Sequence, residues 1–228
     1  AICLIAINSF SQVNVSGVIN EYSKVIGLTF PTCQACDTNL VCLNQIATTT
    51  PSIFAEGDKV LIIQMKGAAI NNSNDINGGK ITNIGNAGNY EFFNVKRVVG
   101  NIVYPERPLT RVYDVAGLVQ LVRIPKYTTD VNVTGKLTAM PWDPVSGIGG
   151  VLALFTTGDV SLWNDIDVAG QGYIGEKVTI NGSPDHCGMN PLLQMMKPAT
   201  SADVCPKGNG IVINDVNFNG GRGPRANG

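Results

Sequence analysis

Short segments of alternating apolar and polar residues predict β-strands along most of the chain. The clearest strand covers residues 57–67, where a compact apolar run is bounded by glycines. Residues 89–99 form a second run, and Gly100-Asn101 separates it from residues 102–104. This pattern predicts a hairpin with a two-residue turn, because Gly and Asn tolerate the positive φ angles that such turns require. A further strand is expected at residues 119–124, and no segment has the periodicity of an amphipathic helix.

From about residue 131 the strands become shorter and are separated by Gly, Asn and Asp. Strands are expected at residues 131–139, 149–155 and 159–162. The segment Asn164–Gly170 is echoed fifty residues later by Asn214–Gly220, with matched residue types at nearly every alternate position. Short strands that repeat and end in glycine are typical of a β-solenoid, in which each rung buries its apolar face against its neighbours. An ordinary β-sandwich is the alternative, because a single echo can arise by chance.

These patterns predict an all-β protein with two regions. Residues 12–125 are expected to form a small antiparallel β-barrel or sandwich, in which residues 68–88, rich in Asn and Gly, make an exposed loop. Residues 126–228 are expected to begin a β-solenoid, similar to a parallel β-helix, that continues beyond the last residue. A cysteine-bracketed loop at 187–205 would leave the stack between rungs, and the barrel would cap the first strand edge.

The first eleven residues indicate export. Ala1–Ile7 is a short apolar run, and Ser9-Phe10-Ser11 matches the small-x-small pattern of a cleavage site. We interpret residues 1–11 as the remnant of a signal peptide and expect the mature chain to be secreted or held at the cell surface. After its removal no apolar run approaches the roughly 18 residues that suggest a membrane-spanning helix, so we expect no transmembrane span.

Composition narrows the range of partners. The chain has 16 basic and 17 acidic residues, and this balance gives no electrostatic footprint for nucleic acid or an anionic membrane. Charged residues make up 14% of the chain, well below the roughly 25% usual in globular domains. Low charge with abundant Gly and Asn suits strands joined by tight turns, whereas the ligand and the oligomeric state are left open.

Five cysteines follow the signal, an odd number for an exported chain. Cys187 and Cys205 bracket the predicted loop, and a disulfide between them would stabilise the fold by roughly 3 kcal/mol in the chain-entropy model. Cys33, Cys36 and Cys42 share a polar segment, where we expect Cys33 to pair with Cys42. Cys36 is then free or bonded to sequence beyond this chain. The spacing of Cys33 and Cys36 keeps a redox or zinc module as the alternative.

A family resemblance rests on seven segments, at residues 57–68, 85–91, 119–125, 141–143, 149–154, 166–172 and 220–228. Together they resemble the N-terminal region of large secreted proteins of Bacteroidetes, and similar segments occur in myxobacterial gliding-motility proteins. Such proteins commonly continue into adhesive repeats and a gliding-motility-associated or type IX secretion C-terminal domain. The resemblance covers nearly the whole mature chain. It implies secretion or surface display, with a link to adhesion or gliding motility, and it implies no catalytic residues.

Two groups of residues are candidates for binding. Asp165 and Asp167 are two apart, so in a strand they point to the same side, and with Asn164 they are the best candidate Ca²⁺ ligands. Paired carboxylates also occur in glycoside hydrolases, but we favour solvated outward positions here. Trp163 and Tyr173 are candidates for stacking on a glycan, although aromatic rings fill cores at least as often.

Three functions are compatible with these observations. The favoured one is a non-catalytic structural and adhesive module of an exported bacterial surface protein, with surface polysaccharide or another cell-surface component as its partner. The alternative is a carbohydrate-binding or polysaccharide-degrading β-helix, such as a lyase or glycoside hydrolase, and the second alternative is the cysteine-based module. The single histidine, His186, is not accompanied by a nucleophile-elbow motif, so we assign no catalytic residue and no cofactor beyond the Ca²⁺ candidate.

Overall fold

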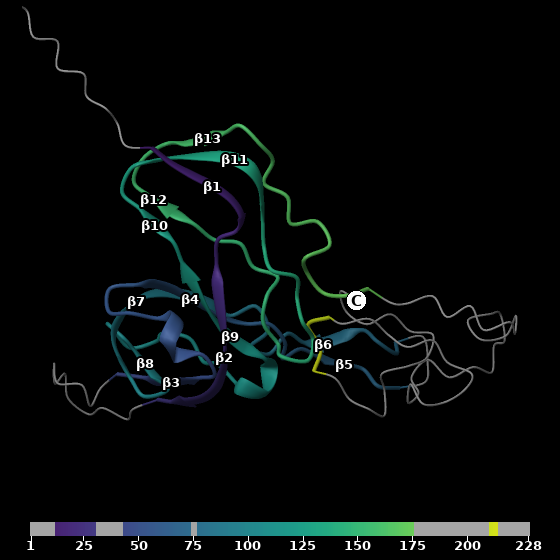
Figure 1. Cartoon of the computed structure of the whole chain (residues 1–228). Helices are drawn as coiled ribbons and strands as arrows, with labels where there is room; N and C mark the ends of the chain where they lie inside the picture. Colours follow the sequence, from purple (N-terminus) through teal and green to yellow (C-terminus); the bar gives the residue numbers. More distant parts are fainter. Residues whose placement is uncertain (1–11, 31–42, 74–76, 176–209, 214–228) are drawn as a thin grey trace, which may run out of the picture.

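The protein consists of a β-barrel and a smaller group of parallel strands, which Figure 1 shows as two parts. The structure, a computed structural model, describes residues 12–30, 43–73, 77–175 and 210–213. Within these residues the chain is all-β, as predicted, and its helical segments are the two short 3₁₀ turns Pro51–Ile53 and Val115–Gly117. No helix among the described residues is long and apolar enough to cross a membrane.

Six antiparallel strands close into the barrel, in the order β2-β3-β8-β7-β4-β9. They are β2 (Glu21–Thr29), β3 (Gln45–Thr48), β4 (Lys59–Gln64), β7 (Tyr90–Val99), β8 (Ile102–Pro105) and β9 (Val119–Ile124). Alternate residues point inward, so that Val60, Ile62 and Leu121 are completely buried in one core cluster. Because each barrel strand pairs on both sides, this part of the protein has no open strand edge.

The predicted hairpin is confirmed. Val99 of β7 pairs with Ile102 of β8, so the turn contains only two residues. Gly100 has a φ of 58°, the left-handed conformation that this turn type requires and that glycine adopts without a steric penalty. The strands expected around residues 59–64 and 119–124 are also present as β4 and β9, and they pair with each other along their full length.

The predicted loop at residues 68–88 contains a small hairpin of its own. Its strands are β5 (Ala69–Ile70) and β6 (Ile81–Asn83), which pair only with each other. All three β6 residues are exposed. Ala68, at its base, is buried and forms a parallel bridge with Val212, so the base of this hairpin is held by a distant segment of the chain.

The second part is an open parallel sheet in the order β1-β11-β13, formed by β1 (Gln12–Val18), β11 (Asp130–Thr138) and β13 (Val160–Leu162). Beside it, the two-residue strands β10 (Lys126–Tyr127) and β12 (Phe155–Thr156) also pair in parallel. Paired side chains lie on one face and stack in aliphatic rows. One row is Val13, Val131 and Val160, and the next is Val15, Val133 and Leu162.

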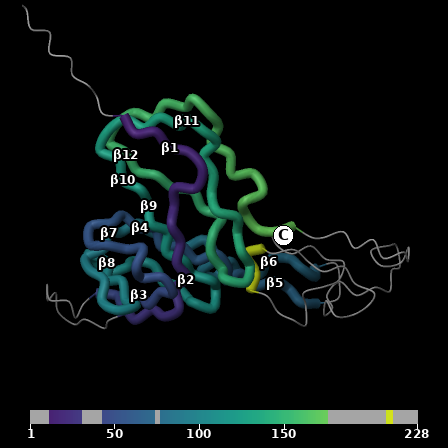
Figure 2. The backbone as a smooth tube through the Cα atoms, in the orientation of Figure 1, coloured from purple at the N-terminus to yellow at the C-terminus, as the bar shows by residue number. Residues whose placement is uncertain are grey.

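Along the sequence, the barrel strands come between β1 and β11, which are the first two strands of the parallel sheet. Figure 2 follows the chain from β1 into β2, around the barrel, and from β9 back through β10 to β11. The sequence had suggested that residues from 12 onward belong to the barrel, but β1 pairs with β11 instead. The alternation of β1 fits either site, and its pairing was decided by contacts of Val13 and Val15 with Val131 and Val133, which are far away in sequence.

A constant spacing relates the later parallel strands. Lys126 pairs with Phe155, Val131 with Val160 and Leu137 with Ile166, and in every pair the two residues are 29 apart. This spacing differs from the fifty-residue echo in the sequence, whose second copy lies outside the described residues. Val212, two residues before that copy, pairs with Ala68. The equal spacing means that residues 126–137 and 155–166 follow the same path, one above the other.

Residues 149–155, here called the strap, join the two parts. The sequence predicts a strand here, but only Phe155 belongs to one. The strap is instead held by side chains of the barrel: the amide of Gln120 bonds both N–H and C=O of Gly149 at 2.9 and 3.0 Å, and that of Asn20 does the same for Ala153 at 2.9 and 2.7 Å. Two buried side-chain amides thus replace a strand partner.

Candidate functional surface

The parallel sheet ends in an open edge, which we define as residues 160–168. The backbone of this segment bonds to Val133 and Leu137 of β11, and Val160 is paired with Val131. On its other side no strand pairs with it in the part of the chain that the structure describes. An unpaired edge presents N–H and C=O groups in a row and is a template for adding another strand. The open edge is therefore a candidate site for contact with another segment or molecule.

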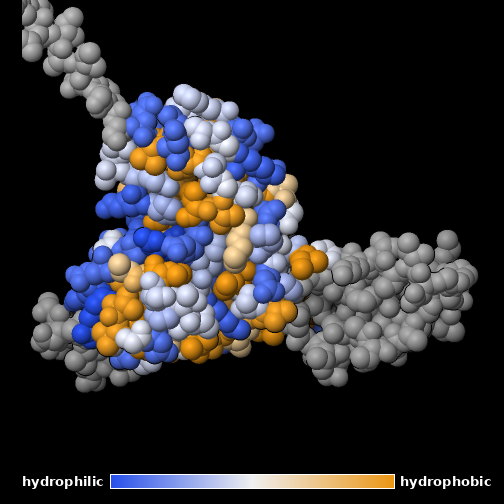
Figure 3. Space-filling view, viewed as in Figure 1, coloured by the Kyte–Doolittle hydropathy of each residue, from blue (hydrophilic) through white to orange (hydrophobic). Residues whose placement is uncertain are grey.

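The side chains of the open edge are apolar and exposed. Val131, Val133 and Leu137 in the middle strand are fully buried, whereas the residues stacked on them, Val160, Leu162 and Ile166, are 41%, 61% and 46% exposed. On the face shown in Figure 3, hydrophobic residues also reach the surface elsewhere, which is usual for soluble domains. The open edge differs from those sites because its exposed residues continue rows that are buried one strand below.

The candidate calcium ligands Asn164, Asp165 and Asp167 lie along the open edge. Asp165 and Asp167 flank Ile166 in extended backbone and bond the N–H and C=O of Leu137 through their own main chain. The Asp167 carboxylate is engaged by Lys136 at 2.6 Å and by the N–H of Ala169. The hydrogen bond and charge of Lys136 lower the pKa of Asp167.

The other two calcium candidates, Asn164 and Asp165, are joined to each other by a hydrogen bond. The side chain of Asn164 accepts a hydrogen bond from the N–H of Asp165. No group of three His, Cys, Asp or Glu side chains suited to a metal is found among the described residues. Asp165 is exposed, and the side chain of Asp167 is 40% exposed and paired with Lys136.

The two candidate stacking residues are in different environments. Trp163 is 71% exposed, beside Asn164 and Asp165. Tyr173 packs edge to face on the buried Trp142, with ring centroids 5.4 Å apart, and its hydroxyl donates to the C=O of Met65. Burial raises the pKa of Tyr173 to about 12, so its hydroxyl stays protonated near neutral pH. In the described region Trp163 thus presents a ring to solvent, whereas Tyr173 is part of the packing.

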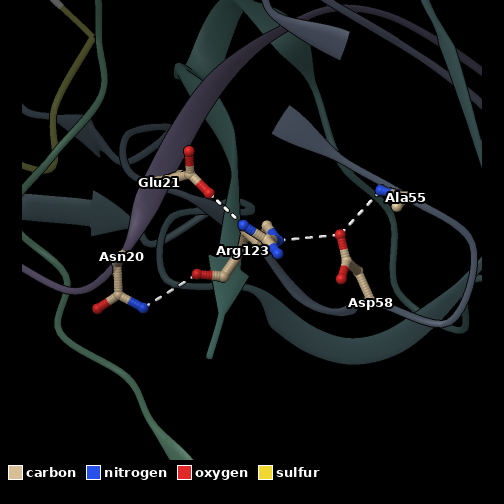
Figure 4. A network of polar contacts seen from close by, with 5 residues as sticks. All are labelled: Asn20, Glu21, Ala55, Asp58 and Arg123. Carbon is tan, nitrogen blue, oxygen red and sulfur yellow. Dashed lines mark hydrogen bonds and ion pairs between the residues drawn. The ribbon is translucent and has the colours of Figure 1, made fainter. Parts of the chain in front are cut away.

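A polar network lies where the chain passes between the two parts (Figure 4). Arg123 of β9 pairs with Glu21 of β2 and, at 2.9 Å, with Asp58, which also accepts from the N–H of Ala55. The C=O of Arg123 accepts from the amide of Asn20. The hydrogen bond that Arg123 donates to Glu21 and the charge of Asp58 raise the pKa of Arg123, which remains cationic. Because both carboxylates pair with Arg123, the network ties β2 and the segment before β4 to β9.

The cysteine predictions lie outside the described residues. This applies to Cys33, Cys36, Cys42, Cys187 and Cys205, and to His186 beside them. The predicted disulfides and the redox or zinc alternative therefore stay predictions.

Sequence reasoning missed the residues that clasp the strap to the barrel. They are Asn20, Gln120 and Tyr22, whose hydroxyl donates to the C=O of Val151 at 2.6 Å. Gln120 lies in β9, a strand with buried residues on both faces. Alternation of apolar and polar residues therefore does not show whether its side chain is buried or in solvent. A polar residue inside such an apolar strand is the one available signal, because buried amides need partners.

Comparison with protein families, with curated proteins and with solved structures finds no match to this chain. The geometry of the molecule is therefore the basis on which its function is considered.

Proposed function

We propose that this chain is a non-catalytic structural and adhesive module of an exported bacterial surface protein. The observation that carries the proposal is the parallel sheet, whose aliphatic rows are buried in β11 and exposed at the open edge. A stack that ends in exposed apolar rows is suited to extension by further strands of the same kind. Function in such a module comes from presenting a long, regular surface rather than from a reactive centre.

In this proposal the parallel strands are the first rungs of a β-solenoid. The constant spacing of 29 residues between paired positions supports a repeating rung. The barrel is inserted after the first strand and holds the strap through Asn20, Tyr22 and Gln120, so it anchors the start of the stack. The resemblance to secreted proteins of Bacteroidetes supports the proposed export of the protein and its proposed role in adhesion or gliding motility.

Surface exposure is the first test. Antibodies raised against the barrel should label intact cells that produce the protein, and protease added to intact cells should remove the labelling while a cytoplasmic marker stays protected. Fab fragments of these antibodies should also reduce attachment of the cells to a polysaccharide-coated surface. Labelling that requires permeabilised cells would contradict the proposed location, and unchanged attachment would contradict the adhesive role.

Glycan binding at Trp163 is a second candidate, favoured by the exposure of this ring beside Asn164 and Asp165. Aromatic rings pack on the apolar faces of sugars, and adjacent amide and carboxylate groups can bond sugar hydroxyls. A glycan-array screen with and without Ca²⁺ should show binding to one glycan class that is lost in Trp163→Ala. The control is Tyr90→Ala, which removes another exposed ring, 51% exposed, from the barrel. An equal loss of glycan binding in Trp163→Ala and Tyr90→Ala, or no binding by the wild-type protein, would contradict a specific glycan site at Trp163.

A further inference from the structure

An apolar pocket of about 240 Å³ lies where the strap meets the outer face of the barrel. Phe92 and Ile124 contribute from the barrel, and Ala153, Leu154 and Phe155 contribute from the strap. The strap covers an outer apolar cluster of the barrel that includes Ile124, but this cover is incomplete at Phe92, which is 41% exposed. A pocket at the junction of two structural parts is a common location for a ligand site.

Lys59 is the charged residue of this lining. Its Nζ lies 5.0 Å from the ring centroid of Phe155 and 5.9 Å from that of Phe92, which is cation–π geometry for both rings. No ion pair of Lys59 with a carboxylate is found among the described residues. The pocket therefore combines apolar walls with one positive charge that lacks a counter-ion.

We propose that this pocket binds a small organic carboxylate with an apolar body, of the arylalkyl acid class. The carboxylate would meet Lys59, and the body would pack on Ile124, Leu154 and Phe92. An engineered cavity of about 150 Å³ holds benzene, so a pocket of this size accommodates one ring and a short chain. A sugar is a poor occupant, because its hydroxyls would face walls that offer few partners. The site is thus independent of the adhesive role and of Trp163.

The test compares two probes of the same shape, 3-phenylpropionate and 3-phenylpropan-1-ol, titrated into the full chain at pH 7. Calorimetry should show saturable binding of the acid that is at least tenfold tighter than that of the alcohol. In NMR spectra the amide shifts should change at residues 153–155 and at Phe92. Equal binding of acid and alcohol, shifts confined to other regions, or no saturable binding of the acid would overturn the proposal.

Separate variants test the contribution of the Lys59 charge and that of the pocket volume to ligand binding. Lys59→Met keeps most of the unbranched apolar stem but removes the charge, and it should abolish the preference for the acid, whereas Lys126→Met, at an exposed position on β10, should preserve it. Ala153→Leu fills the pocket from the strap and should weaken both probes at least tenfold. Retention of the acid preference in Lys59→Met would overturn the assignment. If a variant fails to fold, the two wild-type titrations and their shift map decide the question.

Discussion

The barrel and the parallel sheet treat their strand edges in opposite ways. In the barrel every strand has two neighbours, so all its edges are paired. In the parallel sheet β13 has a neighbour on one side only within the part of the chain that the structure describes, and its apolar residues are exposed. A closed barrel can complete its core with its own residues, whereas a stacked sheet completes each layer only when another layer is added. The difference teaches that closing a sheet buries its apolar rows without further strands, whereas an open parallel sheet leaves the apolar row of its edge strand exposed.

The two parts also differ in how polar groups are used. In the barrel the buried carboxylate of Glu91 accepts hydrogen bonds from Thr110, Arg111 and Tyr113, all within 3.2 Å. These donors hold the segment after β8 against the barrel. At the open edge the ion pair between Lys136 and Asp167 is exposed, and pairs of this kind contribute little to stability. We therefore expect most of the folding free energy to reside in the barrel and the clasped strap.

Truncating equivalent leucines should give the largest contrast. Leu121→Ala, in the barrel, should lower the free energy of unfolding by about 2–5 kcal/mol, because Leu121 is completely buried. Leu162→Ala, at the open edge, should change it by about 0.5 kcal/mol or less, because the side chain is 61% exposed. Urea unfolding of both variants measures the difference. A large cost for Leu162→Ala would mean that another segment of the chain covers the open edge.

Replacing the barrel carboxylate should have the next largest effect. Glu91→Gln should destabilise the protein by about 2–3 kcal/mol at pH 7, because the amide cannot accept from all of its present donors. Burial raises the pKa of Glu91, but the hydrogen bonds from Thr110, Arg111 and Tyr113 outweigh it and hold the pKa below its usual value. Stability from this group is therefore complete above the ordinary glutamate range, about 4.3, and falls as the pH drops through the lower folded-state pKa.

The pH dependence provides the control for Glu91. The difference in unfolding free energy between wild type and Glu91→Gln should shrink as the pH is lowered below about 4. Thermal or urea unfolding of the two proteins across pH 3–7 measures it. A difference that does not change with pH would show that the variant acts through packing rather than through the charge.

Removing the hydrogen bonds between Asn20 and the strap should have a smaller and more local effect on stability. Asn20→Ala removes both bonds to Ala153 and leaves buried backbone groups unsatisfied, which we expect to cost about 1–2 kcal/mol. Hydrogen exchange should become faster at residues 149–155 while β4 and β7 keep their protection. Asn72→Ala, at an exposed position after β5, is the matched control and should change neither. Uniform loss of protection would mean that the strap and the barrel unfold as one unit.

Much of the barrel was predictable because its strands are defined by neighbouring residues. The hairpin between β7 and β8 follows from the Gly100-Asn101 turn and the runs on either side, and β4 and β9 from their own apolar patterns. The strap was harder to predict. Its apolar residues indicate a strand, but its partners are the side chains of Asn20 and Gln120, and no local pattern identifies such partners.

The candidate sites were predictable only in part. The exposure of Trp163 agrees with its place after Leu162, where it interrupts the apolar alternation, and the outward position of Asp165 and Asp167 follows from their spacing. The packing of Tyr173 on Trp142 depends on two segments about thirty residues apart in the chain. The pocket around Lys59 was not predicted at all, because its lining comes from three barrel strands and the strap.

The sequence by itself determined that this protein is built from strands, where β4, β7, β8 and β9 of the barrel lie, and which turn joins β7 to β8. These features depend on periodicity and turn residues within about ten positions, so a local pattern contains them. Only the tertiary structure decided that β1 leaves the barrel for β11, that the later parallel strands stack with a spacing of 29 residues, and which apolar row remains exposed. Those choices depend on burying side chains against distant partners, and alternation specifies that a face is buried without specifying against what.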